Sequence, residues 1–207
     1  MRNFNKEAKI IIDNFPYVHN DTDPFRVLIS TVLSQRSKDE NTHRAAKNLF
    51  AKYPDCYKIS ELIPEDIYEL IKPAGMFRQK AERIIQISKI IKEKYNGIVP
   101  GEIDELIKLP GVGRKTANVM LWVSYSIPAM AVDTHVHRIS NRLGWINTKT
   151  PEASEFQLIK IIDKNLWGPL NGSMVSFGQK VCTPKITKCN LCPLADICPS
   201  SEKKKTV

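Results

Sequence analysis

The apolar positions of this chain recur at the spacing of α-helices. Several stretches place apolar side chains three and four residues apart, which puts them on one helix face. No segment shows the sustained alternation of apolar and polar residues that marks a half-buried strand. The pattern therefore predicts an all-α fold. The clearest stripes are Phe4, Ala8, Ile11 and Ile12, then Phe25, Leu28, Ile29 and Val32.

Helix starts and stops are marked by prolines, capping residues and glycines. Asp23-Pro24 and Thr150-Pro151 each join a side chain that caps a helix to a proline suited to the first helical position. Gly75 and Asn96-Gly97 interrupt the helical pattern. These signals predict helices over 4–14, 24–33, about 39–52, from 64, a long one between Gly75 and Asn96, 103–107, around 119–123, about 132–143, from 151, and about 172–180.

The stretch from Leu109 to Lys115 reads as a tight turn between two helices. Pro110 presets φ at the entry of the turn, and Gly111 and Gly113 can adopt positive φ without a Cβ clash. Such a turn leaves backbone N–H groups unpaired at the start of the second helix, which suits a phosphate oxygen. We therefore expect phosphate contacts from the turn residues Gly111, Val112, Gly113 and Arg114.

Lys115 and Asp133 form a candidate pair for nucleophilic chemistry. Lys115 is predicted in the first helical turn, where the positive end of the helix dipole disfavours a protonated amine. Amine attack on a sugar carbon needs a lysine that can lose its proton, with a carboxylate near it. Two alternatives need no catalysis: Lys115 as a phosphate contact, and Asp133 as the N-cap of the following helix.

Four cysteines near the end of the chain fall within one short stretch. Cys182, Cys189, Cys192 and Cys198 contain one close pair, whereas structural zinc usually takes two close pairs joined by a longer arm. Iron–sulfur clusters are held by four thiolates, often in runs this tight. A cluster is therefore favoured over zinc, and disulfides are the least favoured reading. Cys56 stands apart and is expected to be a buried structural side chain.

The charge balance favours a polyanionic partner. The formal net charge is +9, and the basic residues are spread along the chain, apart from the terminal run Lys203–Lys205, which is expected to be a solvated end. No apolar run approaches the roughly 20 residues needed to span a bilayer, and no signal peptide is evident. We expect a monomeric, intracellular, cytoplasmic protein without a membrane partner.

The stretch Leu109–Asn118, together with Ala131–His135, closely resembles the endonuclease III family of helix-hairpin-helix DNA glycosylases. The resemblance continues through Leu33–Asp39, Gly75–Ala81 and the cysteine array, so that it covers nearly the whole chain. It implies a six-helix barrel with the hairpin over 17–127. Residues 1–16 and 128–207 would then form a second helical subdomain that carries the iron–sulfur loop.

The same resemblance implies a function and a set of site residues. Lys115 and Asp133 would face each other across the cleft between the subdomains, and the four cysteines would hold a [4Fe–4S] cluster. The expected activity is that of a base-excision repair DNA glycosylase with abasic-site lyase activity, which removes damaged, in particular oxidised, pyrimidines from double-stranded DNA. Lys115 would attack the sugar and form a Schiff base, assisted by Asp133.

Two other functions compete with this expectation. A mismatch-specific (T/G or U/G) or otherwise monofunctional glycosylase of the same fold uses the aspartate and water, and Lys115 argues against it. A non-enzymatic DNA-binding scaffold has no use for a carboxylate that faces DNA, so Asp133 argues against that.

The residues that would enter the DNA are less clearly marked. The family places a glutamine in the hole left by the flipped base, but here the aligned position holds Arg36, with Gln35 just before it. Either residue could fill the hole, and Met76 is the candidate for a second, apolar probe. Lys185 and Lys188, between the first cysteines, are expected either to contact phosphate or to offset the charge of the cluster.

Overall fold

The computed structural model describes residues 2–201, so the lysine run 203–205 lies outside the described residues. The described part is helical, and its extended pairing is limited to one isolated bridge between Cys182 and Thr187. The predicted all-α fold is confirmed. No helix within residues 2–201 has both the length and the apolar character needed to cross a membrane.

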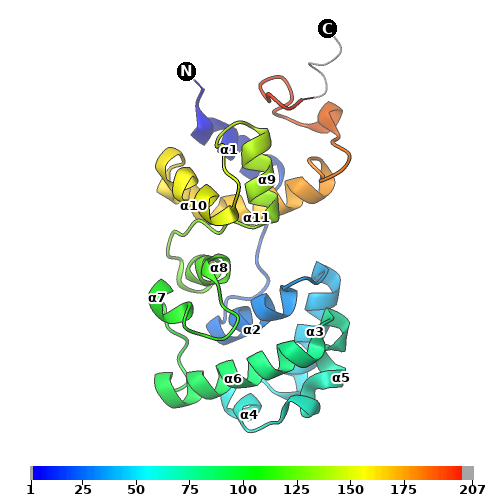
Figure 1. Ribbon diagram of the computed structural model, residues 1–207, viewed down its shortest axis with the longest axis vertical. Helices are drawn as coiled ribbons and strands as arrows, with labels where there is room; N and C mark the ends of the chain where they lie inside the picture. The colour runs from blue at the N-terminus through cyan, green and yellow to red at the C-terminus, as the bar shows by residue number, and fades with distance from the viewer. Residues whose placement is uncertain (1, 202–207) are drawn as a thin grey trace. The chain divides into compact units, whose positions relative to one another are not determined.

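The chain divides into two compact units. We call Asn20–Ser126 the central unit, and the described residues of Met1–His19 together with Ile127–Val207 the terminal unit. The helices of each unit can be followed in Figure 1.

The central unit is built around the long helix α6 and the helix α2. α2 begins as predicted, with Pro24 as its first residue. The Asp23 carboxylate caps it by accepting a hydrogen bond from the Arg26 N–H at 2.8 Å. α2 packs against α3 and α8, and α4 packs against α6. The elements are α2 (Pro24–Ser34), α3 (Asp39–Lys52), α4 (Cys56–Ser60), η1 (Pro64–Ile67), α5 (Tyr68–Ile71), η2 (Lys72–Ala74), α6 (Phe77–Tyr95), α7 (Ile103–Leu106) and α8 (Arg114–Tyr125).

The terminal unit is built around α11, which packs against α1 and α9. Leu170, Met174 and Phe177 of α11 are fully or almost fully buried in its core, and the Phe15 and Phe177 rings lie 4.9 Å apart. The elements are α1 (Phe4–Asn14), α9 (Thr134–Arg142), α10 (Pro151–Ile161), η3 (Lys164–Leu166), α11 (Trp167–Lys180) and η4 (Cys189–Leu191).

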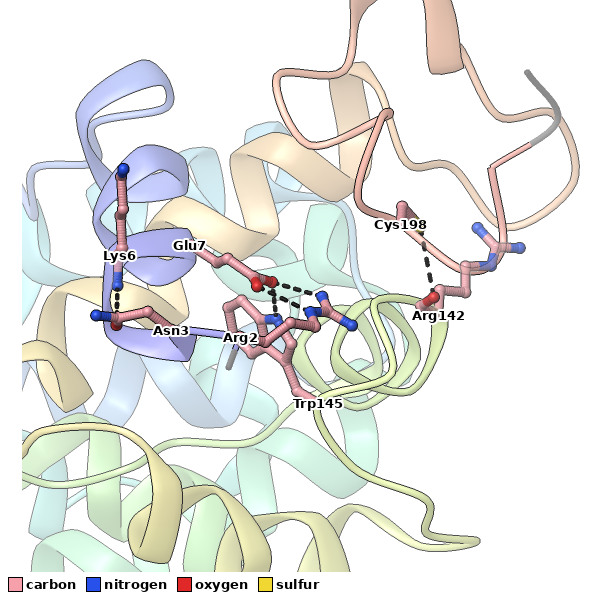
Figure 2. A network of polar contacts seen from close by, with 7 residues as sticks. All are labelled: Arg2, Asn3, Lys6, Glu7, Arg142, Trp145 and Cys198. Atoms are coloured by element: carbon pink, nitrogen blue, oxygen red, sulfur yellow. Dashed lines mark hydrogen bonds and ion pairs between the residues drawn. The ribbon is translucent and has the colours of Figure 1, made fainter. Parts of the chain in front are cut away.

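A buried carboxylate fixes α1 within the terminal unit. Glu7 is only 4% exposed, and it accepts hydrogen bonds from Arg2 Nε at 3.0 Å and Nη2 at 2.6 Å, and from Trp145 Nε1 at 2.7 Å (Figure 2). Every charge in this contact is paired, so the burial of the carboxylate is tolerated. The hydrogen bonds that Arg2 donates to Glu7 raise the pKa of Arg2. The network joins the start of the chain to the segment that follows α9.

Several predicted helix boundaries were wrong. α11 begins at Trp167 rather than near Gly172, because Pro169 lies in the first helical turn, where its missing N–H costs nothing. α9 begins two residues after the predicted start, since the Asp133 side chain caps it. The segment from Pro64 forms a 3-10 turn and a one-turn helix instead of one longer helix. The short helix α4, capped by Asp55, was missed because five residues carry too little periodicity.

Candidate functional site

The predicted helix–turn–helix lies between α7 and α8 of the central unit. Gly111 has a φ of 74°, and a Cβ at this position would lie 2.9 Å from Arg83 Cδ, so the turn requires glycine there. Gly113 has a φ of −99° and open space around it, so of the two glycines only Gly111 uses the positive φ that glycine allows. Gly113 serves instead as the N-cap residue of α8.

The start of α8 presents backbone rather than a capping side chain. Among the described residues, no side chain caps this helix by a hydrogen bond. Gly111 and Gly113 are exposed and Arg114 is half-buried, whereas Val112 is only 5% exposed. Val112 can therefore contact a ligand through its backbone and not through its side chain. The arrangement suits an anion, because N–H groups and the positive end of the helix dipole lie at one place.

Lys115 lies in the first turn of α8, as predicted, and is half-buried. The residues that follow it, from Thr116 to Leu121, are buried. Within the described part of the chain, no hydrogen bond or ion pair involves the Lys115 amine. The backbone of this lysine is thus held by a helix with a buried face, while its amine is not committed to a structural contact.

Asp133 is the N-cap of α9 in the terminal unit, which confirms the predicted capping role. Its Oδ1 accepts hydrogen bonds from the N–H groups of His135 at 2.9 Å and Val136 at 2.8 Å. Within residues 2–201, no hydrogen bond involves its second oxygen, Oδ2. Two backbone donors thus fix the carboxylate and leave one oxygen for chemistry. Lys115 and Asp133 belong to different units, so their meeting at one substrate stays a prediction.

The two histidines after Asp133 have structural contacts. His135 Nδ1 lies 3.2 Å from Arg138 Nη2, and a Cβ at Gly178 would approach that nitrogen to 2.5 Å. His137 Nδ1 lies 2.7 Å from Ser154 Oγ. These contacts join α9 to α11 and α10, which fits a packing role for the two rings.

In the loop after α2, the side chains of Gln35 and Arg36 have different surroundings. Gln35 donates from Nε2 to the Gly111 carbonyl at 2.8 Å, and its Oε1 accepts from Arg83 Nη1 at 3.1 Å. Its side chain therefore joins this loop to the hairpin turn. Arg36 is exposed and has a φ of 53°, a left-handed conformation that is strained for a residue with a Cβ.

The loop before α6 shows a similar backbone. Met76 has a φ of 48° and is 48% exposed, and it follows Gly75 at a φ of 67°. Phe77 opens α6 and packs its ring edge-on against Tyr68, with ring centroids 5.3 Å apart. Met76 is thus the accessible side chain of this loop, while Phe77 belongs to the packing.

The four cysteines predicted as ligands line one cavity in the terminal unit. Its empty space is about 390 Å³, part of which is open to solvent. Among the described residues, no three His, Cys, Asp or Glu side chains are grouped closely enough to hold a single metal ion. The cysteines therefore surround a space rather than converge on one point. The lining includes Cys182, Cys189, Cys192 and Cys198, together with Arg142, Phe177 and Lys188.

Two thiols of this cavity, those of Cys192 and Cys198, resist ionisation when no cation is near them. Burial raises the pKa of Cys192 and of Cys198, and negative charge on the neighbouring cysteines raises it further. A positively charged inorganic core would remove that repulsion. The donor set and its spacing therefore fit a group larger than one ion and rich in positive charge.

Two arginines of α9, which the sequence analysis missed, hold the cysteine loop. Arg142 donates to the carbonyls of Thr183 at 2.6 Å and Pro184 at 2.8 Å, and its Nη1 lies 3.5 Å from Cys182 Sγ. Arg138 donates to the Cys182 carbonyl at 2.9 Å. The Arg142 carbonyl in turn lies 3.5 Å from Cys198 Sγ (Figure 2). Arg138 and Arg142 are four residues apart and therefore lie on one face of α9, and this spacing was the available signal in the sequence.

The two lysines between the first cysteines are both exposed. The Lys188 N–H donates to the Val181 carbonyl at 3.0 Å, and Lys188 also lines the cavity. Lys185 lies in the turn closed by the Cys182–Thr187 bridge. These positions are compatible with both predicted roles, namely contact with phosphate and compensation of charge in the cavity.

A comparison with protein families gives the class of protein. Residues 29–164 match the family model described as "HhH-GPD superfamily base excision DNA repair protein". This segment includes the hairpin turn, Lys115 and Asp133.

Individual relatives narrow the class. The chain is 58% identical to endonuclease III of Thermotoga maritima over 92% of this chain and 90% of that protein. A solved non-covalent endonuclease III–DNA complex matches with a TM-score of 0.91 and 36% identity, over 99% of this chain and 97% of the other. A trapped endonuclease III–DNA covalent intermediate matches with a TM-score of 0.89 and 37% identity, over 96% and 95% of the two chains.

The chain therefore belongs to the HhH-GPD superfamily of base excision DNA repair proteins and, within it, to the endonuclease III family. The predicted family and enzyme class, a DNA glycosylase with abasic-site lyase activity, are confirmed. DNA is confirmed as the class of partner. Proteins of this family generally contain an iron–sulfur centre.

Proposed function

We propose that this protein removes oxidised pyrimidines from double-stranded DNA and cleaves the resulting abasic site, with Lys115 as nucleophile and Asp133 as its carboxylate partner. The observation that carries the proposal is the placement of Lys115. Its amine has no structural partner among the described residues, and it stands in the first turn of a helix whose start suits a phosphate.

The reaction begins with a nucleotide that leaves the base stack, because the glycosidic bond is hidden inside a duplex. The Lys115 amine attacks C1′ of the deoxyribose, and the C1′–N bond to the base breaks with its electron pair going to the base, which takes up a proton. Opening of the sugar ring leaves an imine between Lys115 and C1′. The imine acidifies the C2′ proton, whose loss expels the 3′ phosphate and breaks the strand.

Asp133 accepts the lysine proton or stabilises positive charge that builds on the sugar. Its position is set by the two backbone N–H groups bound to Oδ1, so that Oδ2 is available to the substrate. Asn is also a good N-cap residue. Asp133→Asn should therefore keep α9 intact while it removes the charge, which makes it a clean test of the role.

We further propose that the four cysteines hold a [4Fe–4S] cluster. The cavity that all four cysteines line, and their spacing with only one close pair, support this assignment over zinc. When bound, the cluster supplies cross-links that hold the loop together. Arg138 and Arg142 orient the loop from α9 by binding its carbonyls.

Contacts with DNA follow from the exposed loops. The hairpin backbone at Gly111 and Gly113 and the side chain of Arg114 are proposed to bind phosphate, together with Lys185 and Lys188. Because Gln35 already bridges Gly111 and Arg83, we assign Arg36 to the hole left by the flipped base, and Met76 to the apolar probe. The protein is proposed to act as a monomer in the compartment that holds the DNA.

Borohydride trapping tests the proposed function. The protein is incubated with a duplex that carries one oxidised pyrimidine or one abasic site, and the imine is reduced to a stable adduct. We expect an adduct with the parent protein and with Lys89→Ala, an exposed lysine of the same unit. Lys115→Ala should give none, and Asp133→Asn should slow trapping by about 10²-fold or more.

The other outcomes separate the competing functions. Base release without an adduct would indicate a monofunctional enzyme in which Asp133 activates water, and trapping mainly on T/G or U/G mismatches would shift the substrate class. Neither release nor an adduct across a lesion panel would leave a DNA-binding scaffold.

A further inference from the structure

Lys80 is a buried lysine that the chemistry above does not use. It is only 2% exposed, and it lies in the first turn of α6. Its Nζ donates to the Leu33 carbonyl at 2.8 Å and to the Ala74 carbonyl at 2.9 Å. Burial lowers its pKa, and no carboxylate of the described residues forms an ion pair with it. A lysine is rarely placed like this without a reason, because burying an ammonium is costly.

Both carbonyls that Lys80 binds lie at the ends of helices. Leu33 is in the last turn of α2, and Ala74 is the last residue of η2. The final carbonyls of a helix have no partner within the helix, and the helix dipole is negative there. The two helix ends therefore supply the hydrogen-bond acceptors for the ammonium. The C-terminal end of α2 also supplies partial negative charge, which a carboxylate would otherwise provide. This explains how the ammonium can be buried.

Each of these helix ends leads directly into an exposed loop with unusual backbone. Arg36 follows Leu33 by three residues and Met76 follows Ala74 by two, and these side chains are exposed on left-handed backbone at φ values of 53° and 48°. Such conformations persist only where the surroundings determine them. Lys80 also binds the second loop through its own backbone, since its N–H donates to the Met76 carbonyl at 3.1 Å.

The same helix reaches the hairpin turn. Arg83, one turn after Lys80 on α6, donates to Gln35 at 3.1 Å, and Gln35 donates to the Gly111 carbonyl at 2.8 Å. Three loops of the central unit are thus joined to one face of α6 by side-chain hydrogen bonds. Lys80 carries two of these contacts with a single atom.

From this juxtaposition we propose that Lys80 is a positioning residue, which holds the loop of Arg36 and the loop of Met76 at the separation at which both enter the DNA. It acts through those loops and does not touch the reacting atoms. This inference rests on the proposed function. Its consequence is selective: Lys80 matters when a nucleotide has to be taken out of a duplex, and not when the sugar is already accessible.

Two substrates test this selectivity. The first is a duplex with one oxidised pyrimidine, where the loops must hold the emptied stack; the second is a single strand with one abasic site, where no base has to be displaced. Borohydride trapping rates are compared for the parent protein, Lys80→Met and Lys89→Met. Lys89 is an exposed lysine of the same helix, so the second variant makes the same change of charge without the contacts.

We expect Lys80→Met to slow trapping on the duplex by about tenfold, with less than a twofold change on the single strand, because misplaced loops affect only the first reaction. Lys89→Met should leave both rates unchanged. Loss of both rates by the same factor, or no change in either, would overturn the proposal and leave Lys80 with a role in folding only.

Two further results remain decisive. If Lys80→Met does not accumulate as folded protein, Lys80→Gln replaces it, because the glutamine amide can still donate to one carbonyl. The proposal then requires that Lys80→Gln slows trapping on the duplex more than on the single strand. If the parent protein traps neither substrate, the proposed function fails, and this inference fails with it. If the parent protein traps both substrates and the Lys80 variants show the same ratio of the two rates as the parent, the inference about Lys80 is overturned while the proposed function stands.

Discussion

The central unit and the cysteine loop of the terminal unit hold their loops by different means. In the central unit, helices with fully buried Leu28, Leu49 and Ile84 form a close-packed core, and side chains of α6 tie the exposed loops to it. In the cysteine loop, Leu194 is buried in the core of the terminal unit, but Ile186 and Leu191 are 75% and 62% exposed, so the stretch 183–191 has few apolar contacts. Where an apolar core is present, hydrogen bonds only have to place the loops. Where apolar contacts are few, as in 183–191, the thiolates and arginines have to stabilise the loop.

The largest expected effect comes from removing one cysteine of the cavity. Cys198→Ser should lose iron and the visible absorbance of a cluster, and it should raise amide hydrogen exchange across 181–201 without affecting the core of the central unit. The reason is that the stretch 183–191 has few apolar contacts, so the ligands on either side of it have to hold it in place. Iron analysis and exchange mass spectrometry measure this.

Cys56→Ser is the matched control for that experiment. Cys56 is a buried cysteine of the central unit, 3% exposed and remote in sequence from the four others. It should keep the iron. Equal loss of iron in both variants would show that the effect is general unfolding.

The same Leu→Ala truncation should lower the free energy of unfolding by different amounts in the two regions. Leu49→Ala empties a fully buried site of the central core and should lower the free energy of unfolding by about 2–5 kcal/mol. Leu191→Ala, in the cysteine loop, should change it by less than about 0.5 kcal/mol, because that side chain is already exposed. Urea denaturation followed by circular dichroism gives both values. Similar losses for the two variants would contradict the view that the stretch 183–191 is held without apolar packing.

Arg142 should matter for retention of the cluster more than for the global fold. Arg142→Gln removes the donors to Thr183 and Pro184, and it should shorten the half-life of iron loss to a chelator several-fold. Arg142→Lys keeps the charge but not the planar fork, so we expect an intermediate half-life. Arg44→Gln, at an exposed position of α3, serves as the control. A half-life that depends only on charge would contradict the geometric role.

The smallest effect is expected at Glu105, which ties the start of the hairpin to α6. Hydrogen bonds from Lys108, Tyr95 and Lys94 lower the pKa of Glu105 from 4.5 to about 2. A carboxyl with a depressed pKa adds stability above pH 4.5, and that contribution is lost as the pH falls toward 2. The stability difference between the parent protein and Glu105→Gln should therefore be smaller at pH 3.5 than at pH 7. A constant difference in urea denaturation at the two pH values would exclude this ionic contribution.

Local chemistry explains which features the sequence could predict. The caps at Asp23, Thr150 and Asp133 and the turn at Gly111 act over a few residues, so their side chains determine the structure wherever they occur. The four cysteines that line one cavity could be grouped from their spacing for the same reason. Boundaries were wrong where a proline in the first turn was taken to lie outside the helix, as after Trp167, or where the element was too short to show periodicity, as in α4.

The residues that support the site could not be predicted, because their partners lie far away in the sequence. Lys80 binds a carbonyl 47 residues earlier, and Gln35 binds one 76 residues later. Lys80 falls on the apolar stripe of α6, four residues before Ile84 and seven before Ile87. This was the available signal, but lysine on a helix is normally exposed, and the pattern does not show which carbonyls it binds. The same holds for Arg142, whose acceptors lie 41 and 42 residues further along the chain.

The central claim is that Lys115 itself bonds to the sugar, and peptide mass spectrometry of the trapped adduct tests it most directly. After reaction with a duplex that carries an abasic site, reduction and digestion of protein and DNA, the mass of the reduced sugar should appear on the peptide that contains Lys115. Fragmentation should place it on that side chain, and Asp133→Asn should yield less of the same peptide. A sugar adduct on any other lysine, or on the terminal amine, would contradict the account.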